Sequence, residues 1–219
     1  MKLTAQLLLN PTKEQAQLLV ETLQAANQAC NFISDYGWDK QVFKKYDLQT
    51  AVYYPVKEKF SLSAQMVVRC LSKVADAYQL DKATKRTFRP LGSIAYDSRI
   101  LSYQTSKQRV SVWTLAGRQK IPYLVGDHHQ QLLQYQQGES DLVYEKGRFY
   151  LLATCEVAEG EFFPFVDVLG VDLGIVNLAT TSAGISYSGK QIEAVRQWYF
   201  NRKQVLQSVG TKSAKRRLK

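Results

Sequence analysis

The feature of this sequence that most constrains its fold is a change in the spacing of apolar residues at Pro90-Leu91-Gly92. Before it, apolar residues recur at steps of three and four, as between Met66 and Ala77, which is typical of amphipathic helices. After it they alternate, as at Val110 and Val112, which is typical of strands with one buried face. The chain is therefore neither all helix nor all strand, and we expect the class α+β.

The first segment predicts a strand followed by a helix. Residues 2–9 alternate in strand fashion, and Pro11-Thr12 ends the run. Thr12 with Gln15 is typical of a helix capping box, and the apolar stripe behind it predicts a helix to about Tyr36.

The rest of the N-terminal half predicts a turn and a second helix. A turn is expected around Tyr53-Tyr54-Pro55, because proline interrupts helices. Ser63 is a candidate N-cap for a second helix that runs to about Leu80.

The segment after the change predicts two hairpins. In the first, Val110 and Val112 are expected opposite Ile121 and Tyr123 across a turn near Gly117. The second has its turn at Glu145-Lys146-Gly147 and pairs Leu142 and Tyr144 with Phe149, Leu151 and Ala153. Strands with one apolar face need a surface to close upon, so we expect a small antiparallel barrel.

The strand over residues 2–9 has no partner nearby and is expected to join this barrel. The predicted organisation is therefore a barrel strand over 1–11, a helical insertion over 12–90, the barrel proper over 91–160, and a further domain over 161–219. Residues 156–165, acidic and with Pro164, are interpreted as a linker between the last two.

The net charge of +10 is concentrated at one end of the chain. Eight basic residues and no acidic one lie between Arg196 and Lys219, so this segment carries eight of the ten net charges. Clustering of this kind is typical of proteins that neutralise phosphates, although a solvated terminal helix has the same composition.

Other features exclude several classes of protein. Cys30, Cys70 and Cys155 are odd in number and far apart, so we expect buried thiols and neither a disulfide framework nor a zinc site. No apolar run of eighteen residues and no signal-peptide pattern occurs, so no membrane partner and a cytoplasmic location are expected. His128-His129 is expected in a loop, without metal-chelating spacing and without a role.

The sharpest local signal is Asp172, at the end of an apolar strand through Val171. A second strand over 178–182, a turn at Ala183-Gly184 and a third short strand should complete a meander, with a basic helix from about Gln191. A carboxylate on a rigid strand indicates a metal ligand, although an exposed acid at a strand end is the plain alternative. Gly174 is interpreted as leaving the approach to that carboxylate open.

Two chemistries use such a strand. In ribonuclease H-like nucleases the Asp binds Mg²⁺ with other carboxylates, and two metals clamp the phosphodiester. In actin-like phosphotransferases a similar hairpin holds ATP phosphates, usually with hydroxyl side chains. This chain has Ile175 and Val176 there and a basic helix behind, which favours a polynucleotide.

The residues Gly170-Val-Asp-Leu-Gly-Ile-Val-Asn-Leu-Ala-Thr-Thr-Ser-Ala-Gly184 resemble the first RuvC motif of TnpB, the RNA-guided endonuclease of insertion sequences, which is related to type V CRISPR effectors. Residues 141–157 and 206–218 are similar to that family's preceding strand pair and basic helix. The resemblance covers essentially the whole chain. It implies a wedge barrel with an inserted helical recognition region, followed by the first hairpin and helix of a RuvC (RNase H-like) domain.

The chain departs from the family in its catalytic residues. Complete members supply a Glu and a second Asp from later motifs and a Cys-x-x-Cys zinc module, and none of these occurs here. We therefore expect a truncated nuclease domain that is loosely packed and in which Asp172 alone holds Mg²⁺ weakly. The polypeptide by itself is expected not to cut DNA.

The resemblance implies guide RNA and single- and double-stranded DNA as partners, with sequence read by base pairing. Tyr53, Tyr54 and Trp113 are candidates for stacking on bases, with burial in the core as the alternative. Twelve basic residues are candidate contacts with the nucleic-acid backbone: Lys82, Lys85, Arg86, Arg89, Arg118, Lys120, Arg202, Lys203, Lys212, Lys215, Arg216 and Arg217.

The leading hypothesis is thus a truncated TnpB-like RNA-guided DNA endonuclease that keeps its nucleic-acid affinity. A catalytically inactive RNA-guided repressor and an actin-like phosphotransferase are the alternatives.

Overall fold

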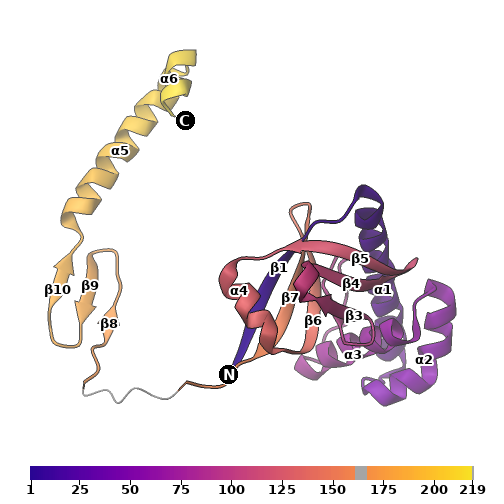
Figure 1. Cartoon of the computed structure of the whole chain (residues 1–219). Coiled ribbons are helices and arrows are strands. Elements are labelled where there is room, and N and C mark those ends of the chain that lie inside the picture. Colours follow the sequence, from indigo (N-terminus) through magenta and orange to yellow (C-terminus); the bar gives the residue numbers. More distant parts are fainter. Residues whose placement is uncertain (161–166, 219) are drawn as a thin grey trace. The chain divides into compact units, whose positions relative to one another are not determined.

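The computed structural model describes residues 1–160 and 167–218 and consists of two compact units, Met1–Glu159 and Gly160–Lys219. The first holds helices packed on a barrel-like sheet, and the second holds a small meander followed by helices (Figure 1). Of the predicted linker over 156–165, Glu156 ends β7, residues 157–160 are irregular, and residues 161–165 lie outside the described residues.

Three helices follow the first strand, β1 (Lys2–Leu9). Helix α1 (Lys13–Lys40) begins at the predicted capping box, in which the Thr12 hydroxyl accepts from the Gln15 amide and the Gln15 side chain accepts from the Thr12 amide. Helix α3 (Ala64–Leu80) is capped by Ser63 and ends where the sequence predicted. Both predictions are confirmed.

The turn predicted around Tyr53-Tyr54-Pro55 is wrong, because helix α2 (Lys45–Phe60) runs straight through it. Its buried residues Leu48, Val52 and Val56 recur every four positions and pack against α1 and α3. Burial of this stripe outweighs the one backbone hydrogen bond that Pro55 cannot donate.

Seven strands form one antiparallel sheet in the order β2-β6-β7-β1-β5-β4-β3. The prediction that the N-terminal strand joins the barrel is confirmed, since β1 lies between β7 and β5. The remaining strands are β2 (Ile94–Tyr96), β3 (Leu101–Gln104), β4 (Arg109–Thr114), β5 (Gly117–Leu124), β6 (Gln136–Glu145) and β7 (Arg148–Glu156).

The two edge strands approach each other and nearly close the barrel. β2 leads into β3 through residues 97–100, and the Tyr103 hydroxyl on β3 donates to Ser140 Oγ on β6 at 2.7 Å. The Tyr96 hydroxyl on β2 donates to the Trp113 carbonyl on β4 at 3.1 Å. These bonds replace the missing ladder between the edges, so the mixed helix-and-sheet unit carries an almost closed barrel.

The predicted hairpin registers are largely confirmed. Leu142 lies opposite Leu151 and Tyr144 opposite Phe149. Val110 lies opposite Ile121, but Val112 lies opposite Gln119 and not Tyr123. The turn at Leu115-Ala116 joins Thr114 directly to Gly117, which sets this register.

A single hydrophobic core connects the helices with the barrel. All three cysteines are buried thiols, as predicted. The Cys30 thiol approaches the Cys70 carbonyl at 3.9 Å, where α1 crosses α3. His128-His129, expected in a loop, lies in the short helix α4 (Asp127–Leu132), which a 3₁₀ turn, η2 (Leu133–Tyr135), continues. A second 3₁₀ turn, η1 (Thr105–Lys107), links β3 to β4.

The second unit contains the predicted three-stranded meander, β8 (Val171–Asp172), β9 (Asn177–Thr181) and β10 (Ser186–Ser188), with β9 in the middle. Gly184 turns between β9 and β10 with a φ of 81°. The basic helix is present but divided at Gly210 into α5 (Lys190–Val209) and α6 (Lys212–Arg217), because Gly210 ends α5 at a φ of 65° and Thr211 caps α6.

Within residues 1–160 and 167–218, no helix combines the length and the apolar character needed to cross a bilayer.

Candidate nucleic-acid interface

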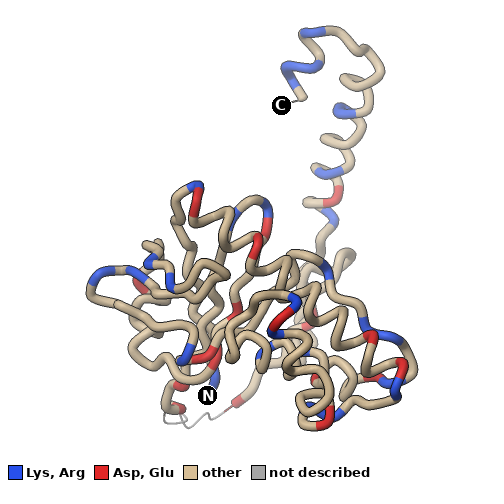
Figure 2. The backbone as a smooth tube through the Cα atoms, turned by 90° about the vertical axis from the view of Figure 1, so that its right-hand side faces the viewer, with Lys and Arg blue, Asp and Glu red and all other residues tan. Residues whose placement is uncertain are grey.

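Helices α5 and α6 carry the acid-free basic cluster predicted from the sequence (Figure 2). Glu193, in the first turn of α5, is their one acidic residue, and it pairs with Arg196 at 2.8 Å. The other described bases of this cluster, which begins at Arg196, form no ion pair within the described residues: Arg202, Lys203, Lys212, Lys215, Arg216 and Arg217. Six uncompensated positive charges in two adjacent helices attract a polyanion.

The same helices combine charge with aromatic side chains. The Arg202 guanidinium lies 5.3 Å from the Trp198 ring, and Trp198 packs edge-to-face on Tyr199. A groove of about 420 Å³ is lined by Tyr199 and Phe200 together with Arg202, Lys203 and Arg217. Bases stack on exposed rings while cations hold the phosphates, so this combination is typical of surfaces that bind nucleic-acid strands.

A second basic surface lies on the outer face of the β4–β5 hairpin. Arg118 and Lys120 are exposed there, as the sequence predicted, while Val110 and Ile121 point into the core. Trp113 is half-buried and lies opposite Arg118, whose guanidinium is 5.8 Å from its ring. The guanidinium also donates to Ser111 Oγ and to the Arg99 carbonyl, so its position is fixed in advance of binding.

The sequence contained a signal for this surface that charge counting over the whole chain missed. Residues 98–126 hold five Lys or Arg and no Asp or Glu. Two of the five, Arg118 and Lys120, were singled out, but Arg99, Lys107 and Arg109 were not. Acidic residues elsewhere in the first unit offset the positive charge of this segment in the net charge of the unit. The excess of Lys and Arg is therefore visible only when charges are counted segment by segment.

The four basic residues after α3 are not equivalent. Lys85 pairs with Asp35 of α1 at 2.9 Å, and this hydrogen bond raises the lysine pKa. Arg86 pairs with Asp81 and also donates to the Asp81 carbonyl. These two charges are neutralised within the unit and hold the segment against the helices. Lys82 and Arg89 are exposed without an ion pair among the described residues, and they remain candidates for phosphate contact.

Exposed tyrosines on α2 were only partly predicted. Tyr54 is 76% exposed and available for stacking, whereas Tyr53 is half-buried against the core. Tyr46, at 79% exposed, was missed because a tyrosine at the start of a helix gives no sequence signal for exposure. One face of α2 carries exposed polar and aromatic side chains, because helical spacing places four residues together there: Tyr46, Thr50, Tyr54 and Lys57.

Asp172 ends β8 opposite Thr180 of β9 and is exposed. In the described ranges 1–160 and 167–218, no three His, Cys, Asp or Glu side chains gather closely enough to hold a metal ion. The carboxylate is thus placed on a strand as predicted, but among the described residues it belongs to no cluster of three such side chains. Its role as a Mg²⁺ ligand stays a prediction.

Gly174 has a different role from the one expected. A Cβ at this position would lie 2.9 Å from the Asn177 carbonyl oxygen, so a side chain is excluded by the β8–β9 turn itself. Gly189, which follows β10, also lies against this turn. A Cβ on Gly189 would lie 2.8 Å from the Ile175 carbonyl oxygen, so a side chain is excluded there too. The two glycines therefore allow the turn to close, and clear access to Asp172 is not their explanation.

No protein-family model and no curated protein matches the sequence. Solved structures similar to the chain include a CRISPR-Cas12f ternary complex, at 11% identity and a TM-score of 0.44 over 90% of this chain, and a Cas12f1–sgRNA–target DNA complex, at 11% identity and a TM-score of 0.35 over 99% of it. The chain spans 53% and 64% of the lengths of those two proteins.

Proposed function

We propose that this chain binds a guide RNA and, through it, target DNA, as a TnpB-like protein whose RuvC-type hairpin is represented by β8 to β10. The observation that carries the proposal is the basic and aromatic surface of α5 and α6, which has no acidic residue from Arg196 onward and follows that hairpin in the chain. Phosphate neutralisation gives affinity without sequence preference, which leaves recognition to base pairing. The basic face of the β4–β5 hairpin supports the same function from the first unit.

Cleavage needs more than the described residues provide. Two-metal hydrolysis requires several carboxylates around the scissile phosphate, and Asp172 is the one acidic residue of the described meander. We propose that Mg²⁺ binds there only when further carboxylates complete the site, as in the family that the motif resembles. The chain by itself is then a nucleic-acid-binding protein without nuclease activity.

A guide-RNA-dependent repressor that occupies DNA without cutting it is the second candidate. It is favoured because Asp172 is the one acidic residue of the described meander. No observation of this kind supports the phosphotransferase alternative. The turn after Asp172 exposes Ile175 and Val176, whose side chains cannot donate a hydrogen bond to a phosphate.

Titration of a structured RNA at several salt concentrations tests the proposal. Wild-type affinity should fall steeply with salt. The triple variant Arg202→Gln, Lys203→Gln, Arg217→Gln should bind more weakly, with the slope of log affinity against log salt reduced by about 2. The matched control changes Lys2, Lys85 and Lys146 to Gln, three lysines already paired with acids. It should leave the slope nearly unchanged.

The same preparation distinguishes the alternatives. ATP should not bind measurably, and a matched DNA target with guide RNA and Mg²⁺ should remain uncut. Equal salt slopes for the triple variant and its control would remove the main support for the proposal. Cleavage abolished by Asp172→Ala would show instead that the chain assembles a complete nuclease site.

A further inference from the structure

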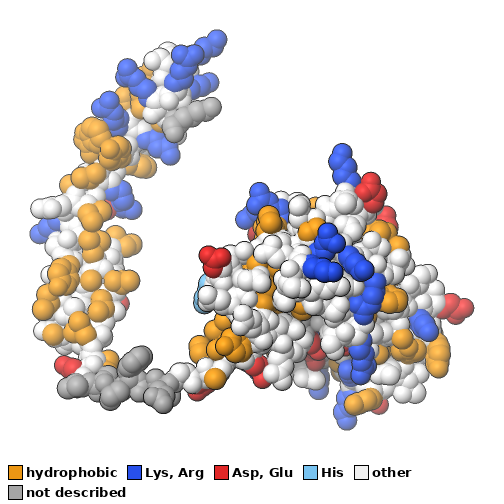
Figure 3. Space-filling model, in the orientation of Figure 1, with side chains coloured by type: hydrophobic (Ala, Val, Ile, Leu, Met, Phe, Trp, Pro, Cys, Tyr) orange, Lys and Arg blue, Asp and Glu red, His pale blue; other side chains and the backbone are white. Residues whose placement is uncertain are grey.

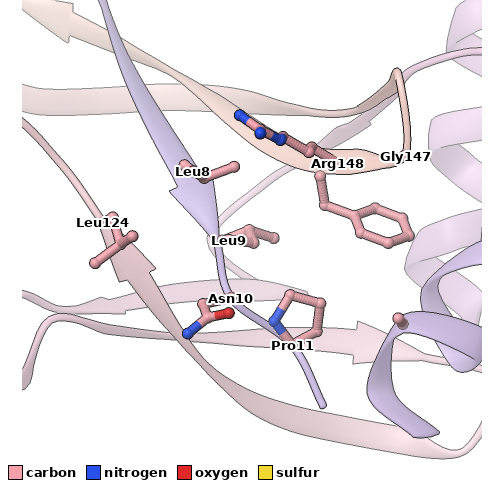
Figure 4. Close-up of a pocket in the computed structure, with 9 residues that line it drawn as sticks. Leu8, Leu9, Asn10, Pro11, Leu124, Gly147 and Arg148 are labelled. Carbon is pink, nitrogen blue, oxygen red and sulfur yellow. The ribbon is translucent and has the colours of Figure 1, made fainter. Parts of the chain in front are cut away.

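The barrel is hollowed at the end of β1, where β5 and β7 flank it. Leu8 lies opposite Leu124 of β5, and Leu9 lies opposite Phe149 of β7. Between them is a pocket of about 300 Å³ whose wall is completed by Pro11 and by Ala16 at the start of α1 (Figure 4). This volume is at the lower end of the range for small-ligand sites and accommodates one nucleotide.

Two polar side chains reach the pocket. The Asn10 side-chain amide and the Arg148 guanidinium are both exposed, and Arg148 forms no ion pair among the described residues. Figure 4 shows Arg148 extending beside Leu8 from β7, with Asn10 on the other side of Leu9 near Leu124. The backbone of Asn10 is fixed, since its N–H donates to the Pro122 carbonyl at 2.8 Å. The site thus offers apolar walls, one amide that both donates and accepts, and one cation.

The pocket continues the basic face of β5. Successive outward-facing residues of this strand are Arg118, Lys120, Pro122 and Leu124, and Leu124 lines the pocket. Lys120 lies about 13 Å along the strand from Leu124, so both residues can contact one bound strand. The Gln15 side chain donates to the Lys120 carbonyl at 3.2 Å, which ties this part of β5 to the start of α1 at the pocket wall.

We propose that this pocket takes one unpaired nucleobase from a strand whose phosphates lie along the outer face of β5. The base is sandwiched between the Pro11 and Leu124 walls, Asn10 pairs with its hydrogen-bonding edge, and Arg148 contacts the adjoining phosphate. An unpaired base occurs in loops and bulges of structured RNA and in displaced single-stranded DNA, and the chemistry recognised is the same in both. The inference rests on the proposed nucleic-acid binding and deepens it.

Abasic substitution combined with pocket filling tests the proposal on the full chain. Short unstructured RNA and DNA oligonucleotides are compared with the same backbones lacking bases. Loss of bases should weaken wild-type binding by about tenfold, a typical effect of losing one stacked base. Ala16→Leu, which fills the pocket from α1, should reduce this abasic penalty by the share that the pocket contributes, while the salt slope and the stacking on the exposed rings of α5 remain. Comparison of the abasic penalty between the RNA and the DNA oligonucleotides shows which of the two nucleic acids supplies the base.

A second variant and a control guard against misfolding. Asn10→Ala keeps the backbone hydrogen bond to Pro122. It should lower the abasic penalty in part, and it should reduce the differences in affinity among oligonucleotides that carry different bases. Lys2→Ala changes one charge at the opposite end of β1 and should leave the penalty unchanged. An equal abasic penalty in wild type and Ala16→Leu, with salt-dependent binding intact, would overturn the pocket but not the proposed function. Absence of any oligonucleotide binding would overturn both.

Discussion

At the scale of single residues, buried tyrosine hydroxyls hold together parts of the first unit that the backbone ladder leaves apart. Tyr103 connects β3 with β6 through Ser140, and Tyr96 connects β2 with β4. Tyr78 of α3 bonds Ser34 of α1 at 2.8 Å and accepts from the Arg86 amide. Burial raises the pKa of Tyr103 to about 12, and it raises the pKa of Tyr96 as well. The barrel therefore depends on tyrosines that remain neutral.

Tyr103→Phe should lower the free energy of unfolding by about 1 kcal/mol at neutral pH, because the Ser140 hydroxyl loses its partner. The Tyr103 pKa is higher in the folded state than the ordinary value of 10. Its contribution is therefore complete below pH 10 and is lost as the pH rises toward 12. Urea unfolding of both proteins from neutral to alkaline pH measures this, and the difference between them should shrink above pH 10. A difference that grows in alkali would contradict the assignment.

At the scale of elements, α2 shows how packing overrides a local signal. Tyr53-Tyr54-Pro55 is typical of a turn, yet the apolar stripe of Leu48, Val52 and Val56 is buried between two helices. Pro55 is exposed and contributes nothing to that stripe. The helix therefore tolerates a proline that costs about 3 kcal/mol in an isolated helix.

Pro55→Ala should stabilise the first unit by about 1 to 2 kcal/mol. The restored hydrogen bond and the better helix propensity outweigh the greater entropy that alanine gives the unfolded chain. Glu58→Ala, an exposed change on the same helix, should alter stability by less than about 0.5 kcal/mol and serves as the control. Chemical denaturation followed by circular dichroism measures both. A destabilised Pro55→Ala protein would mean that the proline bend is needed for packing.

At the scale of the whole molecule, the two units differ in how they bury apolar residues. The first has a continuous core of helices and strands. Among the described residues of the second, Ala214 is the one buried hydrophobic residue, while Leu173, Ile175, Trp198 and Phe200 are more than half exposed. Figure 3 shows such apolar side chains along the surface of this unit. The expected loose packing of this region agrees with that exposure, because little apolar burial stabilises its fold.

The polypeptide Met1–Glu159 should unfold in one cooperative transition with nearly the same midpoint as the full chain, since Ala214 is the one buried hydrophobic residue among the described residues of the second unit. The full chain should bind a hydrophobic dye such as ANS, and the shorter polypeptide should bind much less of it. Calorimetry and dye fluorescence measure the two effects. A separate second transition in the full chain would show that the C-terminal unit has a stable fold of its own.

Local patterns were enough to predict most elements of the fold. The capping box at Thr12, the cap at Ser63 and the alternation of both hairpins depend on neighbouring residues, and each lies where it was predicted. Helix α2 was predicted wrongly because packing between distant segments decides it, whereas the Val112 register follows from the two-residue turn at Leu115-Ala116, a local feature that the prediction did not use. The candidate site divides in the same way. The α5–α6 cluster was visible as composition, whereas the exposure of Tyr46 and the ion pairs of Lys85 and Arg86 depend on tertiary packing.

The sequence by itself determined the change from helical to strand periodicity, the buried cysteines, the position of Asp172 at the end of a strand and the basic helices behind it. These follow from side-chain spacing and composition, which act over a few residues. Only the tertiary structure decided that tyrosine bonds bring the edges of the barrel together, that Asp172 joins no cluster of three ligating side chains among the described residues, and that Asn10 and Arg148 meet at one pocket. Each of these depends on residues far apart in the chain, whose meeting is set by the burial of a common core.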